Sequence, residues 1–230
     1  MIERELQKLK DPVKAKLLQG FFKTGPGEYG EGDFFLGITV PEQRKIAKKY
    51  AGLKLEEVGK LLHSKIHEYR LTALIILTLQ YPRVDEKGKK EIFDFYLRNT
   101  KWINNWDLVD VTTPRIVGEY LLDNDRTVLY TLAKSTDLWE RRIAILATYT
   151  FIQQNDFQDT LKISKLLLKD KQDLIHKAVG WMLREVGKKD LKTLEKFLQQ
   201  HYRKMPRTML RYAIEKFPEK KRKDYLKNVV

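Results

Sequence analysis

The hydrophobic pattern along the chain is helical almost throughout. Apolar residues recur at three- and four-residue spacing in LTALIILTL (71–79), IAILATYTFI (143–152), AVGWMLREV (178–186) and TMLRYAIEKF (208–217). This spacing places the apolar side chains on one face of an α-helix, and no alternating apolar–polar run long enough for a strand stands out. The pattern therefore predicts an all-α protein.

The helical segments also repeat at a fixed interval. Arg70, Trp106, Arg142 and Lys177 each stand near the start of a long apolar helix, at intervals of 36, 36 and 35 residues. A shorter amphipathic segment precedes each of them, at 55–63, 87–98, 126–134 and 160–169, and 207–217 fits one further repeat. Helix pairs at this period are typical of α-solenoids of the HEAT or armadillo kind. No long linker interrupts the series, so we predict a single domain over residues 1–230.

This register predicts a functional surface. Equivalent positions of successive second helices line up along one face of a solenoid. Arg70, Trp106, Arg142 and Lys177 should therefore form one row. The residues four positions further on should form a second row: Leu74, Asp110, Leu146 and Trp181. We expect a concave basic face that carries one carboxylate and two indoles among its cations.

The charge balance narrows the possible partners. The chain has 45 Lys and Arg against 31 Asp and Glu, a net charge of +14 and a pI near 9.6. Such an excess favours nucleic acid first and an anionic membrane surface second. No apolar run approaches the roughly 20 residues of a membrane span, and the charged N-terminal stretch lacks a signal-peptide core. We expect a soluble cytoplasmic protein.

The residue inventory excludes several kinds of chemistry. The chain has no cysteine, which rules out disulfides, thiol catalysis and cysteine–zinc sites. His63 and His67 stand four residues apart, but no Glu follows His63 as a zinc-protease helix requires. We therefore expect neither a metal nor another cofactor.

Two local signals concern helix starts. After the Gly-rich stretch 25–37, Thr39 and Glu42 form a capping-box pattern with Pro41 in the first turn. In NNWDLVD (104–110), Asp107 fits a helix N-cap, which makes Asp110 the third helical residue. A cap explains Asp107 as mainly structural. It does not explain Asp110, which the repeat register turns toward the basic face.

Pattern alone leaves the roles of the other candidates open. For Trp106 and Trp181 the pattern favours core packing over ligand contact, because large aromatic side chains usually lie in the core. Arg142 fits a structural ion pair with Glu140 or Asp110 as well as a phosphate contact.

Three motifs resemble a known family. NNWDLVD, LWERRIAIL and KAVGWMLRE follow in the order and spacing of the AlkD-like, HEAT-repeat DNA alkylation repair glycosylases, and FFLGITVPEQRK is similar to that family's opening segment. The resemblance implies a catalytic carboxylate at Asp110, with Trp106, Arg142 and Trp181 as its companions in the active site. The Gly-rich stretch supplies no site residue in this comparison.

The resemblance also implies a reaction and a partner. The expected enzyme is a monofunctional hydrolase that excises cationic purines of the 3-methyladenine and 7-methylguanine type from duplex DNA, without a need to flip the base. Arg70, Arg142, Lys177, Arg207 and Arg211 are the expected DNA contacts. We expect a monomer in a bacterial or archaeal cytoplasm, associated with the nucleoid when bound. The alternatives are a non-catalytic HEAT-repeat module that binds nucleic acid and, less favoured by the charge, a protein-interaction scaffold.

Overall fold

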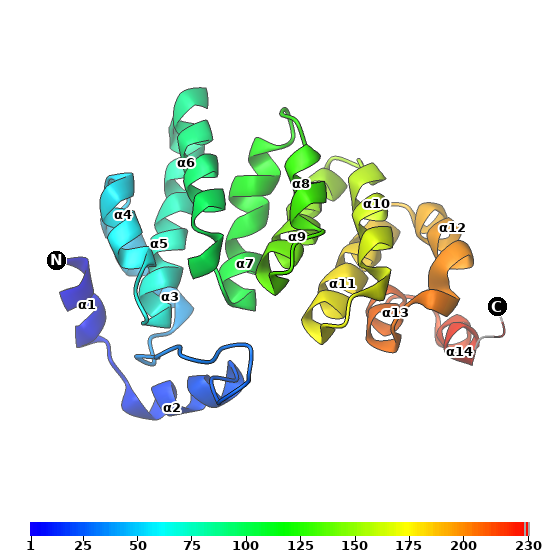
Figure 1. Ribbon diagram of the computed structural model, residues 1–230, viewed down its shortest axis with the longest axis horizontal. Helices are drawn as coiled ribbons and strands as arrows, with labels where there is room; N and C mark the ends of the chain where they lie inside the picture. Colours follow the sequence, from blue (N-terminus) through cyan, green and yellow to red (C-terminus); the bar gives the residue numbers. More distant parts are fainter. Residues whose placement is uncertain (228, 230) are drawn as a thin grey trace. The chain divides into compact units, whose positions relative to one another are not determined.

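The computed structural model describes residues 1–227 and 229 (Figure 1). It divides into two compact units, Met1–Tyr120 and Leu121–Val230. The helices of the first unit are α1 (Ile2–Lys8), α2 (Pro12–Phe21), α3 (Val40–Lys49), α4 (Leu55–Leu62), α5 (His67–Gln80), α6 (Glu86–Arg98) and α7 (Trp106–Thr113). Short 3-10 turns follow α5 and α6 at Tyr81–Arg83 and Thr100–Trp102, and a π-helical turn, Pro114–Gly118, continues α7. The single domain expected over residues 1–230 therefore stays a prediction.

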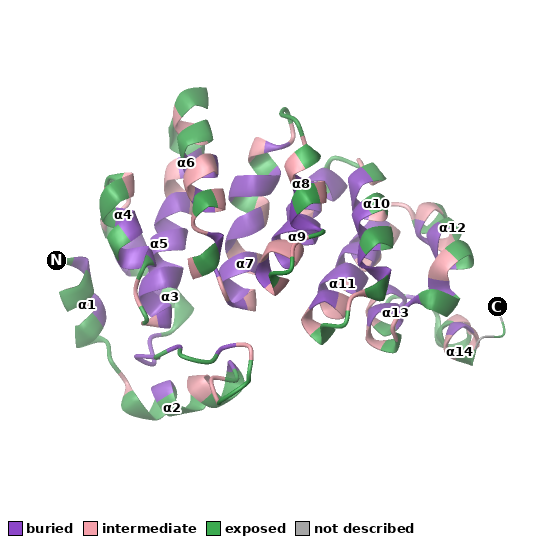
Figure 2. Ribbon diagram, viewed as in Figure 1, coloured by how far each residue is buried: buried purple, intermediate pink, exposed green. Residues whose placement is uncertain are grey.

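Helix α5 is the core of the first unit. It packs against α3, α4 and α7, and eleven consecutive residues, from His67 to Leu77, are buried (Figure 2). Burial on every side explains why this helix is apolar nearly all round rather than amphipathic. It also means that any charged residue on α5 needs a partner inside the protein.

An extended segment, residues 33–39, covers the N-terminal end of α5. Phe34 and Ile66 form a single parallel bridge, in which the His67 N–H donates to the Phe34 carbonyl at 2.8 Å. The Glu68 carboxylate accepts hydrogen bonds from three successive backbone amides, those of Leu36, Gly37 and Ile38. One buried side chain on α5 thus fixes the path of the whole segment.

Helix α2 lies directly on this segment at Gly37. Gly37 has a φ of +86°, and a Cβ there would lie 2.2 Å from the Asp11 carbonyl oxygen. Only glycine meets both the left-handed conformation and the close approach. The next helix, α3, begins as the sequence predicts: the Thr39 N–H donates to Glu42 at 2.9 Å, and Pro41 lies in the first turn. The predicted capping box is confirmed.

The second unit continues the helix pairs. Its helices are α8 (Thr127–Leu132), α9 (Leu138–Gln153), α10 (Gln158–Leu166), α11 (Asp173–Lys189), α12 (Leu191–His201), α13 (Arg207–Ala213) and α14 (Glu219–Lys227). The 3-10 turns Leu167–Lys169 and Tyr202–Lys204 follow α10 and α12. Helix α11 is central and packs against α9, α12 and α13. The second helices α9, α11 and α13 are therefore neighbours, as a stack of helix pairs requires.

The predicted fold class is confirmed. The protein is all-α and solenoid-like, and apart from the bridge at Phe34 the described residues contain no strand. No helix among them is long and apolar enough to cross a membrane.

Candidate active site

Helix α7 begins one residue before the predicted cap. Its N-cap is Asn105, whose side-chain oxygen accepts a hydrogen bond from the Trp106 N–H at 2.8 Å. Asp107 is therefore the second helical residue and Asp110 the fifth, so the prediction of Asp107 as N-cap is wrong. Asn and Asp cap about equally well, which is why the sequence alone favoured the wrong residue.

Trp106 and Asp110 lie one turn apart on the accessible face of α7. The buried residues of this helix are Asp107, Leu108, Val109, Thr112 and Thr113. Trp106 and Asp110 are both half-buried, so each remains partly exposed to solvent. Residues four apart on a helix are neighbours, so an indole and a carboxylate are presented together.

The Trp106 ring is held by aromatic side chains at the end of α2. It stacks on Phe22 at 5.1 Å between ring centroids with an interplanar angle of 18°, and Phe21 meets it edge-on at 5.9 Å. Phe22 in turn stacks on Phe35. This arrangement fixes the indole through contacts from a helix that is distant in sequence, and the solvent-accessible part of the ring keeps a defined orientation.

The charge of Asp110 influences the pKa of a buried phenol, that of Tyr96. Burial raises the pKa of Tyr96 to about 12, and the negative charge of Asp110 contributes to the same rise. The Tyr96 hydroxyl is hydrogen-bonded to Thr112 and Thr113 of α7, at 2.9 and 2.8 Å. Tyr96 thus ties α6 to the turn that follows Asp110.

Beneath Trp106 lies a charged network that the sequence pattern did not reveal. The His67 ring is fully buried and contacts two carboxylates, with Nε2 at 2.8 Å from Asp107 and Nδ1 at 3.2 Å from Asp33. Arg70 donates to the same Asp33 oxygen at 2.6 Å. The pairs join residues 34 to 40 positions apart, which no local spacing can predict. A weak signal was present, since an Arg within an apolar helix requires an acidic partner.

Arg70 does not match its expected position. Its side chain is only 2% exposed, and it pairs with Asp33 and donates to the Ser64 carbonyl. The prediction of a surface phosphate contact is therefore wrong for this residue. The cause is the segment 33–39, which covers the first turns of α5.

The His67 proton is stabilised by this network. Burial lowers the pKa of His67, but the charge of Asp107 and hydrogen bonds to Asp107 and Asp33 outweigh it and raise the pKa to about 9. Burial raises the pKa of Asp33, while His67 and Arg70 more than reverse this and lower it overall. The cluster is an imidazolium and a guanidinium that face two carboxylates.

This gives an expected pH dependence of stability. A histidine pKa raised from 6.5 to about 9 contributes stability that is complete below pH 6.5 and lost as the pH rises through about 9. This pKa difference corresponds to about 3 kcal/mol in the free energy of unfolding. The free energy of unfolding should therefore fall between about pH 7 and pH 10 by more in the wild type than in His67→Gln. Urea titrations of both proteins at the two pH values measure this, and equal losses would contradict it.

The candidates of the second unit occupy equivalent positions in their helices. Arg142, Lys177 and Arg211 are each the fifth residue of their helix, in α9, α11 and α13. Asp110 is likewise fifth in α7, whereas Trp106 is first. The 36-residue spacing therefore misaligned Trp106 by one turn, more than helix ends normally vary.

The environments of these residues differ. Arg142 is 5% exposed and donates to the Leu174 carbonyl in the first turn of α11. The Lys177 side chain is 41% exposed and pairs with Asp173 at 2.8 Å. Arg211 is exposed, and Arg207 is exposed while donating to the Leu226 carbonyl. Lys177, Arg207 and Arg211 are therefore the surface cations of the set. Arg142 ties α9 to α11, and its expected contact with DNA in the active site stays a prediction.

Trp181 is half-buried on α11. Its Nε1 donates to Glu185 at 3.1 Å, and its ring lies 6.3 Å from that of Tyr149. Glu185 is buried and also accepts from Lys188. The indole is therefore fixed at its edge by a carboxylate, which leaves part of the ring accessible.

An apolar cavity of about 370 Å³ lies between α2 and the body of the first unit. Leu17, Phe21 and Phe35 line it, and His67 and Asp107 border it. Within the described residues, no group of three or more His, Cys, Asp or Glu side chains is arranged to hold a metal ion.

These features define a class of protein: a basic, all-α solenoid whose accessible helix faces carry a carboxylate, indoles and cations. The family of DNA alkylation repair enzymes matches residues 2–217. The chain belongs to this family. Membership gives the chain a role in the repair of alkylation damage, with DNA as its partner.

A solved structure supports the fold. The chain superposes on a predicted DNA alkylation repair enzyme from Enterococcus faecalis with a TM-score of 0.70, covering 91% of this chain and 97% of that one. The sequences are 17% identical, so this likeness concerns the fold alone. No curated protein matches the chain significantly.

Proposed function

We propose that the chain is a monofunctional DNA glycosylase that hydrolyses the N-glycosidic bond of cationic alkylated purines in duplex DNA. The main observation in support of this proposal is the pair of side chains on α7: Trp106 and Asp110 stand one turn apart, and both remain accessible. In a DNA alkylation repair enzyme, such a pair suits a substrate that is itself positively charged.

The chemistry requires little acid catalysis. Methylation at N3 or N7 gives the purine ring a positive charge, and cleavage returns the bonding electrons to that ring and neutralises it. The sugar becomes oxocarbenium-like, and a nearby carboxylate stabilises this charge. Water then forms the new bond to C1′ and releases a proton to the solvent. In this scheme Asp110 stabilises the sugar and positions the water, and the indole face of Trp106 one turn away attracts the cationic nucleotide. The contact expected from Trp181 stays a prediction from the sequence.

The distribution of charge supports duplex binding. Residues 121–230 contain 24 Lys and Arg against 14 Asp and Glu, a net charge of +10 of the total +14. Phosphate contacts of this kind give affinity without sequence selectivity. We propose Lys177, Arg207 and Arg211 as the phosphate contacts, with Arg142 tying α9 to α11, the helix that carries Lys177.

The direct test is base release. A duplex treated with a methylating agent is incubated with the protein, and the released bases are separated and counted against an untreated duplex. Release of methylated purines supports the proposal. Tight binding with no release would instead favour the non-catalytic nucleic-acid module.

We expect the protein to act as a monomer on the nucleoid, in the cytoplasm.

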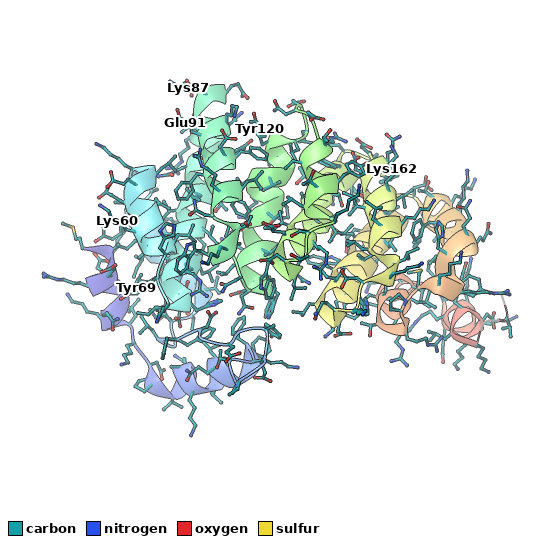
Figure 3. All side chains as sticks on the ribbon, viewed as in Figure 1. Lys60, Tyr69, Lys87, Glu91, Tyr120 and Lys162 are labelled. Carbon is teal, nitrogen blue, oxygen red and sulfur yellow. The ribbon has the colours of Figure 1, made fainter. Side chains whose placement is uncertain are left out.

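The phosphate contacts have their own test. Lys177→Ala should weaken binding to any duplex alike and lower the slope of log affinity against log salt by about 0.9, the value of one neutralised phosphate. Lys60 (Figure 3) is a matched control, because it also forms an i,i+4 ion pair, with Glu56 at 2.9 Å. It lies on α4, the first helix of its pair, whereas Lys177 lies on a second helix. Lys60→Ala should leave the slope unchanged. Identical slopes for both variants would remove Lys177 from the interface.

A further inference from the structure

His67 lies where four segments of the first unit meet. Its ring stacks on Phe35 of the extended segment at 4.5 Å and lies 5.0 Å from Phe22 at the end of α2. Its two nitrogens contact Asp33 of the extended segment and Asp107 of α7. The ring itself begins α5. A single side chain therefore joins α2, α5, α7 and the segment 33–39.

Two routes lead from His67 to Trp106. The first is covalent, because Asp107 directly follows Trp106 in the first turn of α7. The second is aromatic, because Phe22 lies 5.0 Å from the His67 ring and 5.1 Å from the Trp106 ring. A displacement of the imidazole would move both the backbone beneath Trp106 and the ring against which it stacks.

We propose that His67 is a positioning residue for excision: through Asp107 and Phe22 it holds the first turn of α7, and with it Trp106 and Asp110, in the productive orientation. This inference rests on the proposed function, which assigns the reaction to those two side chains. His67 is buried and does not touch the substrate.

The arrangement depends on the charged form of the ring. An imidazolium donates from both nitrogens, whereas a neutral imidazole donates from one only. Deprotonation would therefore set a lone pair against either Asp33 or Asp107. The charged groups that face or adjoin the ring are Asp33, Arg70, Asp107, the neighbouring Glu68 and Lys14, which borders the same cavity. Glu68 is occupied by the amides of residues 36–38, and Lys14 pairs with Asp11 at 3.1 Å.

A purely stabilising role must be separated from positioning. Asp159 provides a matched control, because it is 8% exposed like Asp107 and also pairs with a cation, Arg126, at 2.8 Å. Asp159→Asn should lower stability without changing Trp106 or the excision rate of the folded protein. Asp107→Asn should lower stability and also slow excision about 10- to 100-fold, the loss typical of a misplaced reacting group. Duplex affinity should stay within about twofold in both variants.

The experiment reads the Trp106 ring directly by NMR on the full chain. Its indole resonances are assigned by their loss in Trp106→Phe. In the wild type they should titrate with a midpoint near the His67 pKa of about 9, because the stack on Phe22 loosens as the proton leaves. In His67→Gln this titration should vanish, and in Asp107→Asn, unlike Asp159→Asn, the resonances should already be displaced at neutral pH.

The outcomes separate this inference from the proposed function. Trp106 resonances that stay constant across the wild-type titration, or that respond alike to Asp107→Asn and Asp159→Asn, would overturn the positioning role even if methylated bases are released. A wild type that releases no base would overturn the glycosylase proposal, while the wild-type titration, which needs no DNA and uses Trp106→Phe only for assignment, still decides whether His67 controls Trp106. Excision slowed equally in both Asn variants, once both are folded, would also overturn the positioning role.

Discussion

Replacing Asp110 with asparagine should remove most excision of methylated purines while duplex binding survives or improves. The carboxylate is proposed to stabilise the positive charge on the sugar, which exists only in the transition state. Loss of a single electrostatic stabiliser of this kind costs about 100- to 1000-fold in rate, or roughly 3 to 4 kcal/mol. In the ground state the same negative charge repels the DNA phosphates, so its removal does not weaken binding.

The measurement is single-turnover release of 7-methylguanine from a defined duplex, together with equilibrium binding to the same duplex. Asp94→Asn on α6 is the matched control, because Asp94 is also a part-exposed helical carboxylate, paired with Lys90 at 2.7 Å. It should behave as the wild type does. An Asp110→Asn protein within about twofold of the wild-type rate would rule out the assignment of Asp110.

The helices were predictable because their signal is local. Periodicity of 3.6 residues identified the apolar second helices, and the Thr39–Glu42 box identified the start of α3. The local signal does not fix the start of α7, because Asn105 and Asp107 are both good caps and only two residues apart. The 36-residue repeat register failed at the same point, because the connections between paired helices differ in length. Residues 99–105, which include a 3-10 turn, separate α6 from α7, whereas only residues 63–66 separate α4 from α5.

The candidate site was predictable only where it depends on one helix. Trp106 and Asp110 were identified from NNWDLVD, and the structure presents both on the accessible face of α7. Their supports come from elsewhere in the chain: Phe22 from α2, Asp33 from the Gly-rich stretch, and His67 from α5. Pairing over such distances leaves no periodic trace in the sequence. For the same reason the spacing predicts Arg70 as a surface cation: its partner Asp33 lies 37 residues away, in the Gly-rich stretch.

The structure also changes the expectation for Asp107. As an N-cap it would tolerate asparagine, which caps equally well. As the partner of a buried imidazolium, Asp107 should not tolerate asparagine. The change leaves Asp33 as the only carboxylate beside the His67 charge, and Asp33 also pairs with Arg70. Removing one member of a buried charged pair is strongly destabilising. A local interpretation of this Asp is thus replaced by one that links it to the site.

Excision should be restricted to lesions that carry a positive charge. Uracil and hypoxanthine are neutral, and their departure requires a proton that a general acid must supply. Helix α7 carries two carboxyl groups: Asp107 accepts hydrogen bonds from the Leu108 N–H and His67, and Asp110 is assigned to the sugar. We therefore expect 7-methylguanine to be released at least about 1000-fold faster than uracil or hypoxanthine from duplexes of the same sequence, a difference of about 4 kcal/mol in barrier.

The comparison needs duplexes that differ only in the lesion, with single-turnover release measured at saturating protein so that affinity does not enter. Asp110→Asn provides the background rate for each lesion. Release of uracil at a rate comparable to that of 7-methylguanine would show that the protein supplies a proton to the leaving base. The electrostatic role assigned to Asp110 would then have to give way to acid catalysis by a residue outside the proposed site.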